Sequence, residues 1–240
     1  MVTLEGQKVV VIGGSSGMGL ATAKMLVHSG AQVVIAGRSE RKLSNAMSYF
    51  STGVKALILD FSIEESVKTF FATLDGFDHL VLTADGFPAW GAIKDIDTAA
   101  LRKDFDNKFW GYFLSAKYAL PNIREDGSIT FISGAASRKA ITGTSGLAAV
   151  NGAIVAMAMT LAKELAPIRV NAISPGLVET AAYDWMEPEA RAAMFEHFAE
   201  VAPVKRIGKP DDIAEAILFV ISNTFLTGAV IDVDGGIRLS

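Results

Sequence analysis

The sequence predicts an α/β fold in which helices cover both faces of a parallel sheet. Short runs rich in Val, Ile and Leu alternate with longer segments of helical periodicity along the 240 residues. This alternation is typical of parallel sheets with right-handed crossovers. The run Val9–Ile12 is apolar at every position, as expected for a strand buried on both faces. A glycine-rich turn follows it directly and leads into the first helix.

Seven segments are predicted as strands, because each is a short apolar run bounded by turn residues. They are Val9–Ile12, Gln32–Ala36, Val54–Leu59, His79–Ala84, Ile129–Ser133, Ile168–Ser174 and Val230–Val233. The helices are expected over Leu20–Ser29, from Ser39 to Phe50, from Ser62 onward, over Thr98–Tyr118, from Ser145 to Leu165 and over Asp211–Ser222. Ser39 is a favourable N-cap, and Ser62-x-x-Glu65 has the spacing of a capping box.

A single domain over residues 1–240 is expected, because the chain contains no linker, repeat or low-complexity segment. Half of the residues are apolar, which is enough for a large buried core. One segment, from Asp184 to Val201, is expected to form a helical insert between the last two strands.

The composition argues against several classes of function. A net charge of −4 gives no basis for binding nucleic acid or an anionic membrane. The absence of cysteine excludes disulfides and thiol catalysis. His28, His79 and His197 are far apart in sequence, so no metal site is expected. No segment has the form of a membrane span or a targeting signal, and a cytoplasmic protein is therefore expected.

The turn from Gly13 to Gly19 is predicted to hold the phosphates of a nucleotide. Gly13, Gly17 and Gly19 remove side chains where the backbone turns sharply and where a ligand or the strand comes close. The helix that begins near Gly17 presents free N–H groups and the positive end of its dipole to this turn. The alternative is an ordinary strand–turn–helix unit whose glycines bind nothing.

Several motifs, in their order and spacing, resemble those of the short-chain dehydrogenase/reductase family along nearly the whole chain. They are Gly13–Gly19, Asp60, the strand end Leu80-Val81-Leu82-Thr83-Ala84, Asn107, Val170-Asn171-Ala172, Pro175-Gly176-Leu177-Val178-Glu179-Thr180 and Asp234-Gly235-Gly236. The resemblance implies a single-domain Rossmann fold, with a doubly wound seven-stranded parallel sheet and a nicotinamide dinucleotide across the carboxyl ends of the strands. It also implies that an insert over residues 181–205 forms the substrate loop.

NADP(H) is favoured over NAD(H) because of Arg38. NAD-selective sites have an acidic residue at the end of the second strand, which binds the ribose 2′-OH. Here that strand ends in Ala36-Gly37-Arg38. A guanidinium suits a 2′-phosphate, and Ser15, Ser39 and Arg41 are placed to add to the site. In the alternative, Arg38 and Arg41 are solvated charges at the start of a helix.

The resemblance implies further contacts around the dinucleotide. Asp60 resembles the family's adenine-contacting acid, although an acid here also suits a helix cap. Thr180 resembles the residue that binds the nicotinamide carboxamide, with the backbone of Val178 helping. The expected cofactor-binding residues are Gly13, Ser15, Ser16, Gly17, Met18, Gly19, Arg38, Ser39, Asp60, Ala84, Pro175, Gly176, Val178 and Thr180.

Most of the family's catalytic residues are missing. Members use a serine, a tyrosine and a lysine four residues after the tyrosine, whose charge lowers the phenol pKa. These positions fall on Gly134, Leu147 and Asn151. Leucine donates no proton, and a neutral amide does not replace an ammonium. The remaining catalytic candidates are the helix asparagine, Asn107, and Ser133, with Lys108 expected to point elsewhere on the helix.

The end of the fourth strand also departs from the family pattern. Leu82-Thr83-Ala84-Asp85 stands where the family has Asn-Asn-Ala-Gly. Asp85 is either a substitute base or a loop acid that points to solvent. Phe87, Pro88 and Trp90 are expected to form an apolar wall of the pocket. Tyr183 and Trp185, in the insert, are expected to pack there as lid residues or to take part in the site.

Two classes of function remain open. The first is an NADP(H)-dependent oxidoreductase on a small carbonyl or alcohol, with bound water, Asn107, Ser133 or Asp85 in place of the missing acid. The second is a non-catalytic NADP(H)-binding protein that acts as a sensor or as a subunit of an assembly. The expected partners are an unidentified small molecule and further copies of the chain, as a homodimer or homotetramer formed through the small residues of Ala148–Ala156 and the preceding long helix.

Overall fold

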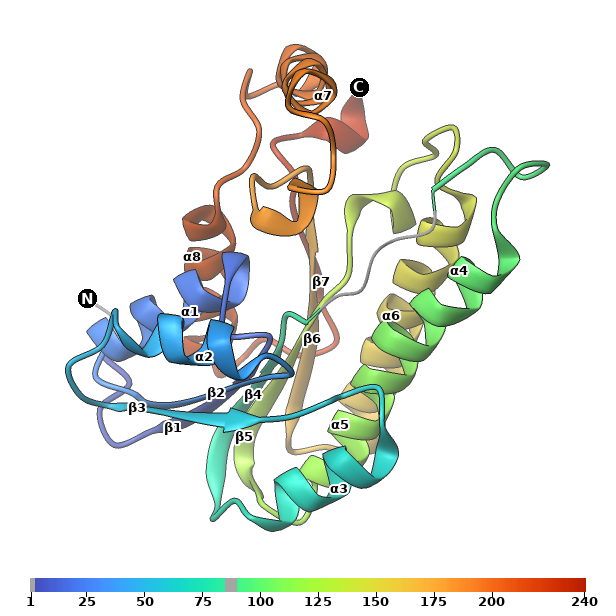
Figure 1. Cartoon of the computed structure of the whole chain (residues 1–240). Coiled ribbons are helices and arrows are strands. Elements are labelled where there is room, and N and C mark those ends of the chain that lie inside the picture. The colour runs from blue at the N-terminus through green and yellow to red at the C-terminus, as the bar shows by residue number, and fades with distance from the viewer. Residues whose placement is uncertain (1–2, 85–89) are drawn as a thin grey trace.

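The computed structural model describes residues 3–84 and 90–240, and it contains one seven-stranded sheet (Figure 1). The strands are β1 (Lys8–Ile12), β2 (Gln32–Gly37), β3 (Val54–Ile58), β4 (Phe77–Leu82), β5 (Ile123–Ile132), β6 (Arg169–Pro175) and β7 (Val230–Val233). Their order is β3-β2-β1-β4-β5-β6-β7, and every neighbouring pair is parallel. The order reverses between β1 and β4. The predicted doubly wound α/β fold is confirmed.

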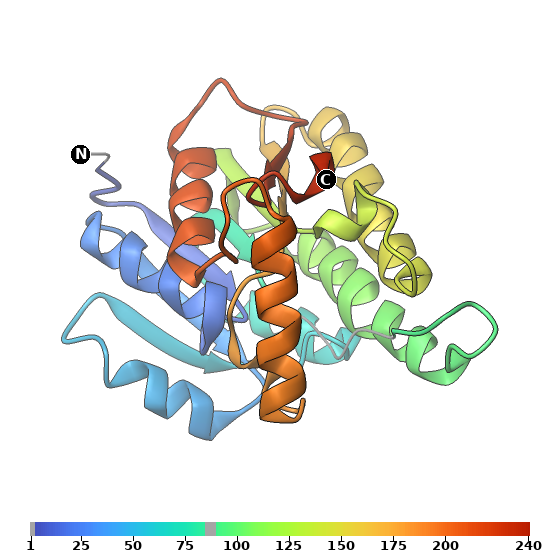
Figure 2. The same cartoon turned by 90° about the horizontal axis from the view of Figure 1, so that it is seen from above.

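Helices cover both faces of the sheet (Figures 1 and 2). One face carries α1 (Gly17–His28), α2 (Glu40–Met47) and α8 (Pro210–Ser222). The other carries α3 (Glu64–Ala72), α5 (Gly111–Ala119) and α6 (Ser145–Glu164), with α4 (Thr98–Asp104) leading into α5. Each layer buries its own apolar cluster against the sheet, so the strands are apolar on both sides.

The alternation of side chains along β1 shows how the two layers share the sheet. Val10 and Ile12 belong to the cluster under α3, α5 and α6, whereas Val9 and Val11 belong to the cluster under α1, α2 and α8. All four side chains are fully buried. A continuous apolar run is therefore required here, since successive residues of a strand point to opposite faces.

The long helix expected over Thr98–Tyr118 is present, but it is not regular. Between α4 and α5, the segment Phe105–Trp110 is π-helical. Such segments place one extra residue in a turn and are frequent at functional sites. This segment packs against α6 and carries two buried polar residues, Asn107 and Lys108.

Two local predictions were wrong. Ser62 does not begin a capping box, because α3 starts at Glu64 and its N-cap Ile63 makes no side-chain cap. Instead the Ser62 hydroxyl donates to the Asp60 carboxylate at 2.6 Å. Strand β5 begins at Ile123 rather than Ile129, because a register shift against β4 accommodates extra residues. Gly127 lies at that irregularity, where a Cβ atom would overlap the carbonyl oxygen of Asp78.

The predicted insert forms α7 (Pro188–Val201), preceded by a short 3-10 turn. No residue of α7 is fully buried. Figures 1 and 2 show α7 lying above the edge of the sheet at which the strands end. The segment therefore covers the carboxyl ends of the strands without belonging to either core.

Within the described residues, α6 is the one helix whose length and composition would suffice to cross a membrane. In this fold it packs against β6 and against the π-helical segment. Its residues Val150, Ile154 and Ala158 are at most 1 % exposed. The apolar character of α6 is therefore accounted for in part by the core of the domain.

His79 is buried near the amino end of β4, at the end of the strands opposite to the one that α7 covers. Its ring nitrogens lie 2.8 Å from Ser128 Oγ and 3.0 Å from Gln7 Oε1. Burial lowers the pKa of His79 to about 4, since the charged imidazolium loses its hydration. In the unfolded chain this histidine takes up its proton near pH 6.5.

His79 therefore makes stability fall as the pH is lowered from about 6.5 to about 4. In that window only the unfolded chain binds the proton, and the effect on the free energy of unfolding approaches 3 kcal/mol, an order-of-magnitude figure. We expect His79→Gln to show a shallower decline than the wild type in urea denaturation at pH 7 and pH 4.5. His28→Gln, at the exposed end of α1, is the control and should follow the wild type. Parallel pH dependence of the wild type and His79→Gln would contradict the assignment.

Candidate functional site

The candidate site lies at the carboxyl edge of the sheet, where the strand order reverses between β1 and β4. In doubly wound sheets, ligands bind in the crevice that opens at this point. The structure brings most of the predicted cofactor-binding residues to this edge, on the turn after β1, the end of β2 and the loop after β6.

The turn between β1 and α1 is held by close backbone contacts. Gly13 has φ +91°, and its N–H donates to Ala36 O at 2.8 Å. A Cβ atom at Gly13 would lie 2.5 Å from the backbone nitrogen of Ala84, and one at Gly19 would overlap the carbonyl oxygen of Gly13. These two glycines are therefore required by the packing of α1 against the strand ends.

Thr83 completes this contact, and its part was missed in the sequence. Its hydroxyl donates to the carbonyl oxygen of Ile12 at 3.0 Å, and it lies directly beside Gly13 and Gly19. The backbone nitrogens of Thr83 and Ala84 also donate to Ile12 O. Ala84, predicted at the cofactor, is thus fixed at the end of β1.

Gly17 differs from the other two glycines, because a Cβ atom there would meet a side chain and no backbone atom. It has φ +51°, and a Cβ atom there would approach only the side chain of Thr180, at 3.3 Å. The first turn of α1 and the loop after β6 therefore face each other. Ser16 is the N-cap of α1 with an extended backbone and makes no capping bond, and Met18 follows it in the first turn.

The end of β2 carries the predicted adenosine side of the site. The guanidinium carbon of exposed Arg38 lies 5.7 Å from the centroid of the Phe61 ring. Ser15 Oγ lies beside Gly37, 3.4 Å from the position of a Cβ atom there. Within the part of the chain that the structure describes, no carboxylate forms an ion pair with Arg38. The guanidinium is therefore available to an anion.

Ser39 and Asp60 both make local bonds. Ser39 is the predicted N-cap of α2, and its hydroxyl accepts from the backbone of Lys42 at 3.2 Å. The Asp60 carboxylate accepts from the backbone and the hydroxyl of Ser62 through one oxygen, Oδ1. Asp60 thus holds the turn before α3, and its role at the adenine remains a prediction.

The loop after β6 is pinned at several points. Gly176 N donates to Val233 O at 3.1 Å, and a Cβ atom at Gly176 would lie 2.8 Å from Asp234 O. Buried Val178 forms a bridge with Gly208, and the Thr180 hydroxyl accepts from Ala182 N. Pro175 closes β6 at the start of this loop. The loop therefore keeps a fixed position opposite α1.

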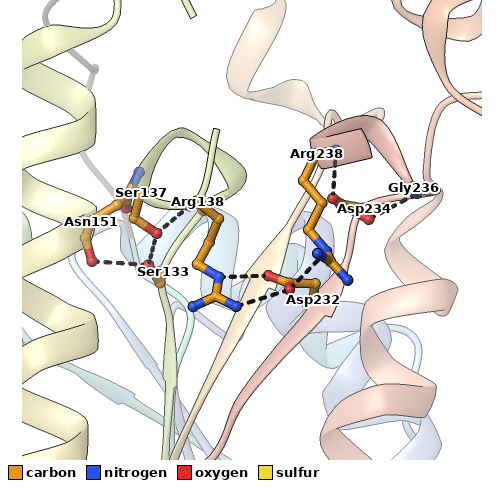
Figure 3. Close-up of polar contacts among 9 residues, drawn as sticks. Ser133, Ser137, Arg138, Asn151, Asp232, Asp234, Gly236 and Arg238 are labelled. Carbon is orange, nitrogen blue, oxygen red and sulfur yellow. Dashed lines mark hydrogen bonds and ion pairs between the residues drawn. The ribbon is translucent and has the colours of Figure 1, made fainter. Parts of the chain in front are cut away.

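A second set of polar contacts surrounds the end of β5, one strand further along the sheet (Figure 3). The Ser133 hydroxyl is buried, donates to the backbone oxygen of Asn151 at 3.0 Å, and lies 3.3 Å from Ser137 Oγ. Ser137 in turn donates to Gly134 O at 2.8 Å. Ser133, a predicted catalytic residue, thus ties β5 to α6.

The prediction that Lys108 points away from this region was wrong. Lys108 is 2 % exposed, and its ammonium donates to the carbonyl oxygen of Ser133 at 3.3 Å. Asn107 lines a groove of about 620 Å³ between α3 and the α4–α5 helix, together with Lys103 and Trp110. The spacing in the sequence indicated this direction, because Lys108 lies four residues before Tyr112 and residues four apart share one face of a helix. In the structure Tyr112 is fully buried.

Asn151 fills the space that a side chain at position 134 would need. It is 2 % exposed, its Oδ1 atom has no hydrogen-bond partner among the described residues, and its Nδ2 atom lies 2.8 Å from the position of a Cβ atom on Gly134. The backbone of Gly134 has φ 175°, which any residue adopts. Glycine is therefore favoured at this position by the lack of space for a side chain and not by the backbone conformation. Leu147 lies one helical turn earlier on α6 and is half-buried.

The remaining candidates are not among the contacts described above. Asp85, Phe87 and Pro88 are outside the described residues. Trp90 and Trp185 are 45 % and 62 % exposed. The Tyr183 ring packs edge-on against Phe195, with centroids 5.6 Å apart, which is consistent with packing in the insert. Residues 3–84 and 90–240 contain no group of three side chains that would hold a metal ion.

Asp232 on β7 joins two arginines above the same edge of the sheet (Figure 3). Its carboxylate lies 3.3 Å from Arg138 Nε and 3.0 Å from Arg238 Nε. Asp234 accepts from the backbone of Gly236 and Arg238. This cluster, which sequence patterns did not indicate, ties the loop after β5 to the C-terminal turn.

Known proteins resemble the chain along nearly its whole length. A family model described as Enoyl-(Acyl carrier protein) reductase matches residues 12–238. Short-chain dehydrogenase/reductase ucsE of Acremonium sp is 32 % identical over 97 % of this chain and 96 % of its own. A small-chain dehydrogenase solved in complex with NADPH is 41 % identical, with a TM-score of 0.84 over 98 % of this chain and 99 % of the other. A short-chain dehydrogenase/reductase described as glucose/ribitol dehydrogenase, from Brucella melitensis, is 29 % identical, with a TM-score of 0.92 over 100 % of both chains.

The contact between Gly134 and Asn151 gives a test of stability. We expect Gly134→Ala to lower the free energy of unfolding by about 1–3 kcal/mol, because the new methyl group meets the buried amide. In an Asn151→Ala background the same change should cost clearly less. The measurement is a double-mutant cycle by urea denaturation.

The control for that cycle is Gly152→Ala on the same helix, since a Cβ atom at Gly152 meets nothing within 4 Å. It should be neutral or stabilising by up to about 1 kcal/mol in both backgrounds. Additive effects of the Gly134 and Asn151 changes would show that the amide does not occupy this space.

Proposed function

Because the chain belongs to the short-chain dehydrogenase/reductase family, we propose that it binds NADP(H) and works as an oxidoreductase on a small carbonyl or alcohol. The observation that carries the choice of coenzyme is Arg38, an exposed guanidinium at the end of β2 with no acidic residue beside it on the strand. The NADPH complex of the 41 % identical relative supports the same choice.

The residues present fit such a dinucleotide. Helix α1 begins at Gly17, and the first backbone N–H groups of a helix, which have no partner within it, suit phosphates. Arg38, with Ser15 nearby, would hold a 2′-phosphate through charge-assisted hydrogen bonds. Thr180, across from Gly17, would hold the nicotinamide end. Bound there, the reduced coenzyme supplies a hydride.

The chain's own residues define the rest of the pocket. The fixed loop after β6 and helix α7 above the sheet edge would restrict water and orient a substrate against the end of β5. Leu147 presents an aliphatic group where the family has its tyrosine, so we propose that this protein works without a phenol as proton donor. Water in the crevice would supply that proton.

Leu147, in place of the family's tyrosine, also supports a second candidate function, a non-catalytic NADP(H)-binding protein. A leucine at position 147 and an amide at 151 suit a pocket that keeps the coenzyme and lacks the usual acid. Such a protein would act as a sensor of coenzyme or as a subunit of an assembly.

We also propose that the protein is cytoplasmic and forms a homodimer or homotetramer. Large apolar side chains are exposed on the two helical elements predicted for the interface: Trp110 and Phe113 on the α4–α5 helix, and Met159 on α6. Size-exclusion chromatography with light scattering would give the number of copies.

Arg38→Asp should weaken the coenzyme preference. We expect the wild type to bind NADPH at least tenfold more tightly than NADH in calorimetry, since a charge-assisted pair contributes about 1.5–3 kcal/mol. Arg38→Asp should lose most of that difference. Lys163→Gln, which removes an exposed cation at the far end of α6, should leave it unchanged. Equal binding of both coenzymes by the wild type would contradict the assignment of Arg38.

Turnover separates the two candidate functions. The oxidoreductase should oxidise NADPH in the presence of at least one carbonyl from a broad panel, followed by absorbance at 340 nm. An assembly subunit or sensor should bind NADPH without turnover. The combined variant Gly134→Ser, Leu147→Tyr, Asn151→Lys should then gain activity, because it supplies the missing donors in the same cradle.

A further inference from the structure

The end of β5 holds a positive charge that the proposed function has not used. Lys108 is buried to 2 % exposure, and its ammonium donates to the carbonyl oxygen of Ser133. The Ser133 hydroxyl donates to the backbone of Asn151 on α6. Lys108 and Asn151 therefore meet the same residue from two different helical elements, the π-helical segment and α6.

The direction of the Lys108 side chain follows from the helix that carries it. Asp104, Lys108 and Tyr112 are spaced four residues apart, and all three are at most 2 % exposed. The π-helical segment Phe105–Trp110 lies between them and packs against α6. This places the lysine on the inner face of the helix, at the carboxyl end of β5.

At position 151, α6 carries a neutral asparagine and no cation. Its amide is buried against Gly134 with one atom, Oδ1, lacking a donor among the described residues. An amide carries no net charge, so α6 contributes no cation to this cluster. A neutral amide lies on one side of Ser133, and the ammonium of Lys108 lies on the other.

We propose that Lys108 supplies the positive charge of the active site, in place of a lysine on α6. This inference rests on the proposed function. Hydride addition to a carbonyl carbon moves the electron pair of the C=O bond onto oxygen, and one proton from water then completes the alcohol. The ammonium of Lys108 would stabilise that oxygen while negative charge develops.

A charge at the end of β5, which borders the crevice proposed for the coenzyme, also has a consequence for binding alone. The oxidised ring carries a positive charge and the reduced ring is neutral, while the phosphates of the two forms are the same. Lys108 should therefore disfavour NADP⁺ relative to NADPH. One unit charge acting through partly hydrated protein corresponds to about a threefold to tenfold change in that ratio.

The test compares the dissociation constants of NADP⁺ and NADPH by calorimetry. In Lys108→Gln, which keeps a donor toward Ser133 and removes the charge, NADP⁺ should tighten relative to NADPH by about threefold to tenfold. Lys108→Arg should keep the wild-type ratio. Lys163→Gln, which removes an exposed cation at the far end of α6, is the control and should also keep it. An unchanged ratio in Lys108→Gln would overturn the proposal.

Lys108→Met gives a second route if Lys108→Gln does not unfold cooperatively, since methionine retains an apolar stem of similar length. It should shift the ratio in the same direction. The proposed function and the role of Lys108 are contradicted by different results. Absence of binding of either coenzyme to the wild type would contradict the proposed function, whereas binding with the same ratio in both neutral variants would contradict only the role of Lys108.

Discussion

Helix α1 approaches the end of β1 so closely that a single methyl group at Gly19 would overlap the carbonyl oxygen of Gly13. This contact fixes the neighbouring loops on the side of the molecule proposed to bind the coenzyme. It aims the first turn of α1 at the crevice, brings Gly17 to the side chain of Thr180, and joins the end of β4 to β1 through Thr83. The positions of three loops thus depend on the absence of side chains at two glycines.

Where backbone geometry decides a position, the sequence was sufficient to predict it. The glycine turn, the seven strands and the cap at Ser39 follow from residue types that leave the chain few conformations. Arg38 was assigned to the end of β2 because strand length and turn residues place it there. The capping box predicted at Ser62 is absent for a physical reason as well. The Ser62 hydroxyl donates to Asp60, two residues away, and this local bond competes with capping of the helix.

Side-chain direction at the end of β5 was less predictable. Asn107 and Lys108 are adjacent in sequence. Which of the two side chains points toward the end of β5 depends on how the π-helical segment packs against α6. Likewise, the sequence shows a glycine at 134 and an amide at 151, but only their positions in space show that one makes room for the other. Such pairs lie far apart along the chain, and neither residue has a local signature.

The energetics of Lys108 bear on why it is there. Burying an ammonium costs several kcal/mol of hydration, and a well-packed apolar residue of similar volume often serves stability as well or better. The carbonyl of Ser133 and the other polar groups around the lysine offset part of this cost. A charge kept in such surroundings acts strongly on whatever enters the crevice, because little water screens it. Lys108 is therefore costly for folding, and under the proposal the same burial strengthens its action on the oxygen of a reacting carbonyl.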